Sequence, residues 1–306
     1  MSRISLSVAI AALAVLAAPQ APAQPAAPAT PAVTANVTTV GANLNISPKR
    51  VTFDRNRRSA TVYIYNQGNA AATFDVSLVD RAMLPDGQIV ALSDAESRPE
   101  AKPYAEQVKS ASSMLLVSPR RVTLAPGQGQ TIRLRANPQD SAAAEYRSHL
   151  TITTIPPRDA GLTAEAAAGV GPNELRFQIN SVFGLSIPAI IRTGDADVRA
   201  GIENVRLEYA EVTPQGQTTP RRTAVAVFDI VRLGTNSLFG NIEIRPTGAK
   251  NSEVIGLARG VGVYPEVGRR TLRIPLNRPL AAGEKLEVTF TDDDTSPGKL
   301  LAKQAS

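Results

Sequence analysis

Four groups of residues have the types and spacing that could do chemistry. His149 is the only histidine, and a metal centre built on it would need carboxylates at ligand spacing, which the sequence does not show. Ser296 and Lys299 fit the Ser-x-x-Lys pattern of serine acylases by letters. That chemistry needs both side chains on one helical turn, and Pro297 and Gly298 between them oppose a helix. We therefore treat the match as chance, and we expect His149 at the surface or edge of a sheet.

The other two groups are a glycine pair and a run of aspartates. Gly127 and Gly129 lack the third glycine, the lysine and the following helix of a phosphate-binding loop, so we interpret them as a hairpin turn. The aspartates at 292–294 could bind a hard cation, but such a run is more often a solvated turn, which is our prediction. No G-x-S-x-G elbow presents a serine nucleophile. We therefore expect no enzyme activity, no metal and no cofactor.

The composition excludes further classes of protein. The chain has 306 residues and no cysteine, which rules out disulfide scaffolds, thiol nucleophiles, zinc fingers and iron–sulfur sites. Its net charge is +6, but the arginines are scattered, tryptophan is absent and aromatic residues make up 4%. Nucleic-acid binding on single strands needs a basic groove with aromatic side chains for stacking. We therefore expect no nucleic-acid partner.

The first residues have the layout of a secretory signal peptide. Arg3 is followed by an apolar run over 8–18 and by small residues at Ala21 and Ala23, and the run is too short to span a bilayer. We expect a signal peptide over 1–23, followed by a disordered Pro/Ala-rich segment over 24–41. The chain is therefore predicted to be exported and not membrane-spanning.

The elements that must position any site are strands. Ile132, Leu134 and Ala136 alternate with Arg133 and Arg135, a pattern typical of an antiparallel strand with one buried and one wet face. Strand signals recur at intervals of about 8–12 residues with no amphipathic helix between them. The sequence therefore predicts an all-β fold of two immunoglobulin-like β-sandwich domains in tandem.

The domain limits follow from turn and hinge signals. We expect the first domain over 42–193 and the second over 194–295, with a tail over 296–306. Residues 174–192 are expected to form one long strand. The polar stretch 83–113 is expected to be a loop with a short hairpin at Pro85–Gly87, and Gly260 and Gly262 are expected to mark a bulge or close packing of strands.

One segment resembles a known family. The run SPRRVTLAPGQGQTIRLRANP at 118–138 is similar to the signature of PapD-like periplasmic pilus chaperones, whose motif is matched here by Leu124, Pro126, Gly127, Gln130 and Arg133. The runs PKRVTFD at 48–54, TVYIYNQGNAAATFDVSL at 61–78 and SIPAIIR at 186–192 also resemble strands of the family's first domain. The resemblance covers roughly residues 42–291 and is loose in the second domain.

The resemblance implies a chaperone of the chaperone–usher systems that build fimbriae at the cell wall. Such a chaperone binds a pilus or surface-coat subunit that lacks its final strand, lends the last strand of its own first domain, and delivers the subunit to an outer-membrane usher. Leu175, Phe177 and Ile179 alternate with polar residues in 174–180 and fit the donor strand. From the residues alone, an ordinary half-buried strand would show the same pattern.

The resemblance also implies a clamp for the subunit's terminal carboxylate, made by an arginine of the first strand and a lysine of the last. Arg50 aligns with the arginine, but the lysine's position falls on Gly184 or Pro188, depending on where a gap is placed. Arg50 therefore either acts with another basic residue, or this chain grips its subunit differently. The insertion at 83–113 is a second departure that could supply contacts.

Two readings from other classes compete with the chaperone. One is a structural or adhesive two-domain β-protein of a surface fibre, although residues 24–39 show little of the apolar alternation that a fibre subunit's own donor segment would have. The other is an exported hydrolase, for which the catalytic groups are lacking. A dimer in which two free copies cap each other's edges is left open.

Overall fold

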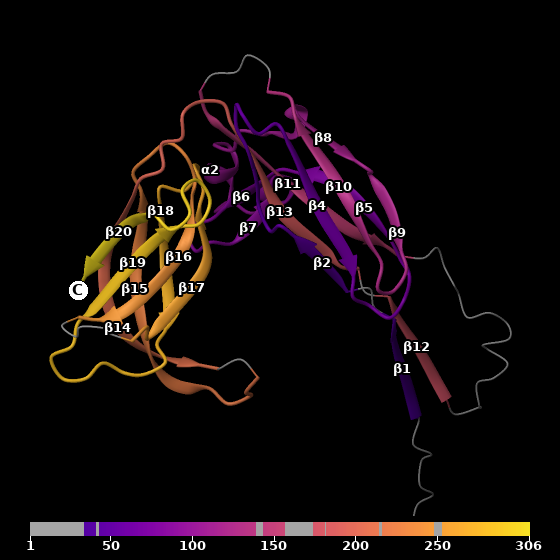
Figure 1. The fold of residues 1–306 in the computed structure, drawn as a ribbon. Helices are drawn as coiled ribbons and strands as arrows, with labels where there is room; N and C mark the ends of the chain where they lie inside the picture. The colour runs from indigo at the N-terminus through magenta and orange to yellow at the C-terminus, as the bar shows by residue number, and fades with distance from the viewer. Residues whose placement is uncertain are drawn as a thin grey trace, which may run out of the picture. The chain divides into compact units, whose positions relative to one another are not determined.

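The computed structural model describes residues 34–40, 43–138, 143–156, 174–180, 182–213, 216–247 and 253–306, and for 34–40 and 174–180 it describes the backbone only. The expected signal peptide and residues 24–33 lie outside these ranges. In the described ranges, no helix is both long and apolar enough to cross a membrane. The predicted all-β fold is confirmed, because strands make up most of the described chain (Figure 1).

The first sandwich consists of two sheets that close over one core. One sheet has the order β2 (Leu44–Ser47), β4 (Ser59–Asn66), β10 (Gly129–Ala136), β8 (Leu115–Ser118). The other has the order β3 (Val51–Phe53), β13 (Gly184–Arg192), β11 (Glu145–Ile155), β5 (Ala72–Val79), β9 (Arg121–Leu124). The core includes Phe53, Phe74, Ile132 and Leu150. In β10 the apolar residues face this core and the arginines face water, as the alternation predicts.

The second sandwich repeats this construction. One sheet has the order β14 (Ala200–Val212), β15 (Arg221–Arg232), β18 (Arg269–Pro275). The other has the order β17 (Gly256–Val263), β16 (Leu238–Pro246), β19 (Leu286–Asp292), β20 (Leu300–Ala305). Phe228, Ile230 and Phe290 are buried between them. The expected bulge is present: the pairing of β16 with β17 slips between Gly240 and Ile242, and Gly260 has φ +66°.

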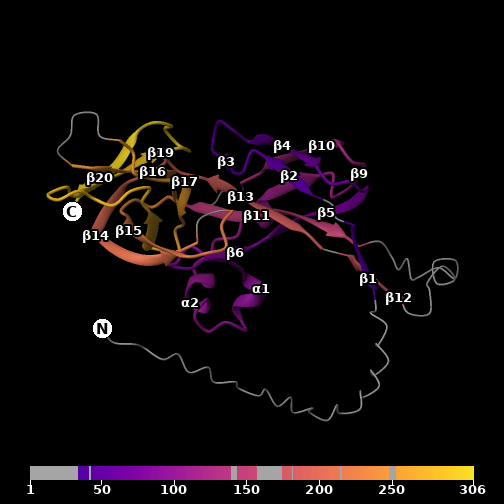
Figure 2. The same cartoon turned by 90° about the horizontal axis from the view of Figure 1, so that it is seen from below.

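The insertion between β5 and β8 is more ordered than a loop. The expected hairpin is formed by β6 (Arg81–Met83) and β7 (Ile89–Ala91), and its turn contains Gly87 at φ +89°, a conformation that favours glycine. Two short helices follow, α1 (Leu92–Ala95) and α2 (Lys102–Ala105) (Figure 2), and then a 3₁₀ turn (Ser112–Met114). The buried apolar residues of the insertion form a small core of their own: Leu84, Val90, Ala95 and Ala101. This core explains why the largely polar insertion still folds.

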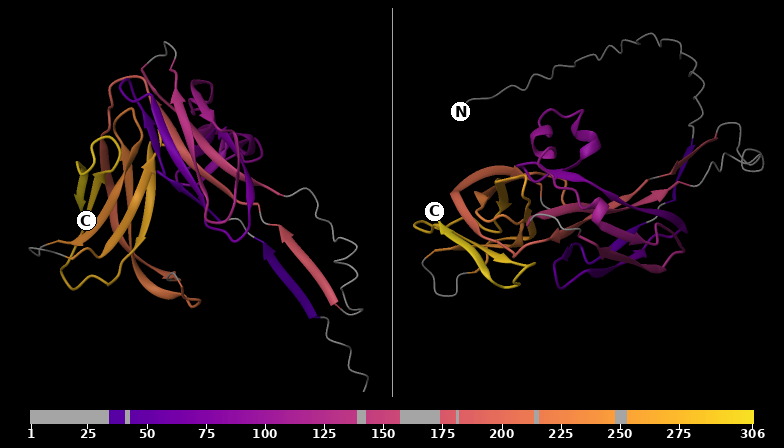
Figure 3. Two further views of the ribbon diagram at one scale, coloured as in Figure 1. Left: turned by 45° about the vertical axis from the view of Figure 1, so that its right-hand side comes forward. Right: turned by 90° about the horizontal axis from the view of Figure 1, so that it is seen from above.

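Three sequence expectations need correction. Within the segment expected to be disordered, β1 (Thr34–Val40) pairs with β12 (Glu174–Asn180) in a two-stranded sheet (Figure 3), which its β-branched residues favour. The long strand expected over 174–192 is divided into β12 and β13, with residues 182 and 183 outside any strand. The tail contains β20, whose backbone pairs with β19.

Candidate functional site: an open strand edge beside buried arginines

Strand β13 has unpaired backbone on one side. Strand β11 pairs with its whole length, from Gly184 to Arg192. On the other side, β3 runs parallel to it and pairs only with residues 189–191. In the described part of the chain, residues 184–188 therefore form an open sheet edge.

The phase of the β11 ladder shows which groups this edge offers. The N–H of Thr154 donates to the carbonyl of Phe183 at 2.9 Å, and the N–H of Thr193 donates to that of Ala144 at 3.1 Å. Because antiparallel ladders alternate, the odd-numbered residues of β13 bond to β11 and the even-numbered ones point their backbone groups away. The open side therefore offers the carbonyls and N–H groups of residues 184 and 186, whereas the carbonyl of 188 lies where the parallel pairing with Val51 begins. Pro188 has no N–H, and at this phase it removes no bond from the β11 ladder.

The apolar side chains of β13 also alternate, and they occupy its odd-numbered positions. The odd-numbered residues of β13 pack in or against the first core, namely Leu185, Ile187, Ala189 and Ile191. Just before the strand, the side chains of Val182 and Phe183 are 58% and 46% exposed. In the sequence the odd-numbered positions of β12 are also apolar: these are the predicted donor residues Leu175, Phe177 and Ile179. The structure confirms that they belong to a strand, while their contact with a partner stays a prediction.

Arg50 and Arg192 share one carboxylate at the end of β13. The Nη2 atoms of Arg50 and Arg192 lie 3.1 and 3.0 Å from Oδ2 of Asp294, and Thr52 Oγ1 donates to its Oδ1. Burial raises the pKa of Asp294, but the charges of Arg50 and Arg192 outweigh it, so this pKa lies below its usual range. The prediction of a solvated turn over 292–294 is therefore wrong for Asp294, although Asp293 is exposed. Asp292 is also buried, and its carboxylate accepts backbone N–H groups of the turn that follows.

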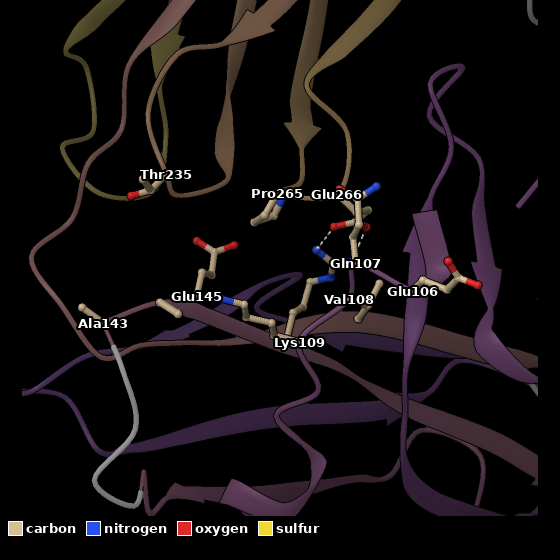
Figure 4. A pocket seen from close by; sticks show the side chains of 11 residues that line it. Glu106, Gln107, Val108, Lys109, Ala143, Glu145, Thr235, Pro265 and Glu266 are labelled. Atoms are coloured by element: carbon tan, nitrogen blue, oxygen red, sulfur yellow. Dashed lines mark hydrogen bonds and ion pairs between the residues drawn. The ribbon is translucent and has the colours of Figure 1, made fainter. Parts of the chain in front are cut away.

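Two further buried ion pairs lie where the two sandwiches meet, and their carboxylates, Glu145 and Glu266, line a pocket there (Figure 4). Arg192 Nε donates to Glu145 Oε2 at 3.0 Å, and the same oxygen accepts the N–H of Ser237. Arg147 Nη1 donates to Glu266 Oε2 at 3.1 Å, and the guanidinium lies 3.7 Å from the ring centre of Tyr264. The Arg147–Glu266 pair and the hydrogen bond from Ser237 to Glu145 connect β11 to loops of the second sandwich. The Arg192–Glu145 pair connects β13 to β11 within the first sandwich.

The structure places Arg50 in this cluster rather than at a surface. Its side chain is 6% exposed, Nη2 also donates to Ser237, and the guanidinium lies 4.8 Å from the ring centre of Phe239. Its Nε and Nη1 atoms have no hydrogen-bond partner in the described part of the chain. Arg192 supplies a second cation beside Arg50, whereas Gly184 and Pro188 carry no cationic side chain. In the described residues, no group of three or more histidines and carboxylates could hold a metal ion.

His149 is buried, not at a surface or edge. Its ring meets that of Tyr264 edge-on at 6.2 Å between centroids, and it belongs to β11 beneath the second sandwich. Burial, followed by the positive charges of Arg147, Arg81 and Arg50, lowers its pKa from 6.5 to about 3.

This low pKa predicts a loss of stability in mild acid. Since the folded state keeps His149 neutral, its contribution is complete above pH 6.5 and is lost as the pH falls toward 3. From pH 7 to 5 the free energy of unfolding should fall by about 2 kcal/mol more in the wild type than in His149→Phe. Urea unfolding at several pH values measures this, and parallel curves would contradict it. The carboxylates with lowered pKa respond mainly below this window.

Sequence reasoning missed five charged residues of the site: Arg192, Asp294, Glu145, Arg147 and Glu266. A usable signal existed in β11, where Glu145 and Arg147 both lie in an otherwise apolar and weakly polar run with no wet face. Charges in such a strand are seldom buried unless they are paired.

Comparison with solved structures returns pilus chaperones. The E. coli chaperone DraB is 12% identical, and the match covers 89% of this chain and 98% of that one, with a TM-score of 0.41. The Salmonella enterica chaperone SafB, solved with the SafA pilin, is 12% identical; the match covers 89% of this chain and 99% of that one, with a TM-score of 0.41. CsuC of Acinetobacter baumannii, solved with the tip subunit CsuE, is 12% identical; the match covers 86% of this chain and 97% of that one, with a TM-score of 0.40.

The matched structures are named as chaperones. No family model matches this chain, and neither does any curated protein. At this identity and TM-score, shape alone carries no argument about function.

Proposed function

We propose that this protein is a periplasmic chaperone that captures pilus or surface-coat subunits by strand addition and passes them to an outer-membrane usher. The observation that carries the proposal is the open edge of β13 over residues 184–188. An exposed edge is a hazard that folded proteins normally cover, since it templates pairing with other chains. An edge that is kept open suits a protein whose task is to pair with another chain.

The apolar residues beside this edge supply the second requirement. A strand added to an edge gains affinity from main-chain hydrogen bonds and specificity from alternate side chains that enter pockets. Val182 and Phe183 are exposed where the edge begins, and the sequence of β12 has the same apolar parity. We assign Leu175, Phe177 and Ile179 to the partner's core, in keeping with the resemblance to pilus chaperones.

Arg50 is assigned to the subunit's terminal carboxylate. The two unpartnered donors of its buried guanidinium, Nε and Nη1, favour this role because a buried donor without an acceptor is costly. A carboxylate would satisfy one of these donors, since Nε and Nη1 face opposite sides of the guanidinium, and Arg192 lies within the same cluster. In this proposal the second cation of the clamp is Arg192 instead of a lysine.

A matched pair of variants in β12 tests the proposal. Phe177→Asp should abolish co-purification of a small exported subunit from cells that assemble surface fibres, because it places a charge in the partner's apolar core. Gln178→Asp, at the adjacent position of opposite parity, should keep the partner. Mass spectrometry of the co-eluting protein and thermal unfolding of both free variants complete the measurement.

Two outcomes would reject the donor-strand role. If Phe177→Asp unfolds the free protein while Gln178→Asp does not, Phe177 belongs to this chain's own core. If the wild type co-purifies with no subunit and is instead found within the fibres, the protein is a structural or adhesive component of them.

A further inference from the structure

The outward face of the sheet β2-β4-β10-β8 carries positive charge that this sheet does not neutralise. Arg133 and Arg135 are exposed on β10, and neither forms an ion pair among the residues that the structure describes. No aspartate or glutamate occurs in any of the four strands. The residues directly opposite the two arginines are hydroxyl or apolar: Thr61 and Ser118 for Arg133, and Ser59 and Leu116 for Arg135.

Outward arginines on two other sheets have a carboxylate beside them. Arg121 of β9 pairs with Asp75 at 3.4 Å, and Arg206 and Arg273 both pair with Glu208. The two arginines of β10 instead lie two residues apart on one strand, about 7 Å from each other, so their charges repel. An acidic partner would supply the counterions that the sheet lacks.

Two tyrosines and a leucine share this face with the arginines. Tyr63 and Tyr65 of β4 are stacked with their ring centroids 6.5 Å apart, and the Tyr63 ring lies over Gly129, where a Cβ atom would collide with its hydroxyl group. Tyr63 is 48% and Leu116 is 62% exposed. Tyrosine and arginine are enriched at protein–protein interfaces, whereas aspartate and glutamate are depleted there. The insertion packs on the other side of the first sandwich and leaves this face uncovered (Figure 2).

We propose that this face, formed by Tyr63, Tyr65, Leu116, Arg133 and Arg135, docks an extended acidic segment of a partner protein whose carboxylates occupy alternate positions. An extended chain repeats its side chains on one face every two residues, about 7 Å, which matches the spacing of the two arginines along β10. Each guanidinium can donate two parallel hydrogen bonds to one carboxylate, and the tyrosine rings offer contact area beside them. The open edge of β13 belongs to the other sheet, so this site is separate from the one assigned to subunit capture.

Three capped peptides are the probes, titrated into the whole protein at constant ionic strength and followed by NMR shifts. TTETETT places two carboxylates on one face, TTQTQTT replaces them with amides, and TTEETTT places them on opposite faces. TTETETT should bind with a Kd about tenfold lower than TTQTQTT, the difference expected for two exposed charge pairs, and TTEETTT should lie between them. The shifts should concentrate in β4 and β10, and higher salt should reduce the difference. Equal affinity for TTETETT and TTQTQTT would overturn the proposal.

Substitutions of exposed residues locate the site with little risk to the fold, which thermal unfolding checks. Arg133→Gln/Arg135→Gln should remove the preference for TTETETT, whereas Tyr63→Ala should weaken TTETETT and TTQTQTT alike. Arg273→Gln is the matched control: it removes an outward arginine of another sheet and should change neither affinity. If it weakens TTETETT as much as Arg133→Gln does, the attraction is one of net charge and the site is rejected. Binding of phosphatidylglycerol vesicles through Arg133 and Arg135 without any preference among the peptides would assign the face to a membrane surface and also reject the proposal.

Discussion

Arg192→Ala is expected to lower the free energy of unfolding by about 3–5 kcal/mol, the cost of removing one partner of a buried ion pair. Arg192 is 4% exposed and serves two carboxylates on different sandwiches, Glu145 and Asp294. Its loss leaves both carboxylates buried without this cation. Urea unfolding followed by fluorescence of the tyrosines measures the change, with the midpoint and slope fitted separately.

Arg192→Lys is the matched control for charge. It keeps the positive charge but cannot reach both carboxylates with a planar fork, so we expect it to lie between wild type and alanine. In the alanine variant the two sandwiches should also unfold less cooperatively, which calorimetry shows as a broadened or split transition. A loss below 1 kcal/mol for Arg192→Ala would mean that the cluster is solvated and contributes little.

Glu266→Ala should have a comparable effect at the second pair, again about 3–5 kcal/mol. Glu266 accepts from both terminal nitrogens of Arg147 and from the backbone N–H of Met83. The variant therefore leaves the Met83 amide without its acceptor and the buried Arg147 guanidinium with only the Arg81 carbonyl. Hydrogen exchange at the Met83 amide should rise by orders of magnitude, since its acceptor is gone.

Lys303→Ala is the surface counterpart within the same chain. Lys303 pairs with Glu287 at 2.8 Å, but its side chain is half exposed, so its removal should cost less than about 1 kcal/mol. If Glu266→Ala costs no more than Lys303→Ala, the burial of the Arg147 pair does not decide its strength. The double variant Arg147→Met/Glu266→Leu should cost less than Glu266→Ala alone, because no charge is left unpaired.

The strands were predictable because their alternation is local. Ile132 and Leu134 show their buried face within five residues, whatever the rest of the chain does. β20 was missed because LLAKQA lacks such alternation, and it is a strand only because β19 supplies a partner. The helices of the insertion were missed for a similar reason, since each is a single turn held by its contacts.

The charged cluster was hidden from the sequence for a different reason. Asp294 lies 102 residues from Arg192, and neither residue type indicates that the two will be buried together. The donor strand and Arg50 could be named because a motif resembles a family. The low pKa of His149 depends first on burial and then on the charges of Arg147, Arg81 and Arg50, of which only Arg147 is near it in the sequence.

The core of the second sandwich includes two side chains that the chain contributes before residue 194. Met83, from the insertion, and Ile190, from β13, both belong to its buried cluster. The Met83 backbone is also hydrogen-bonded to Glu266. A gene fragment that encodes the second half alone would thus lack part of its own interior. The unit that recombination can exchange between relatives without repacking is the pair of sandwiches together with the insertion.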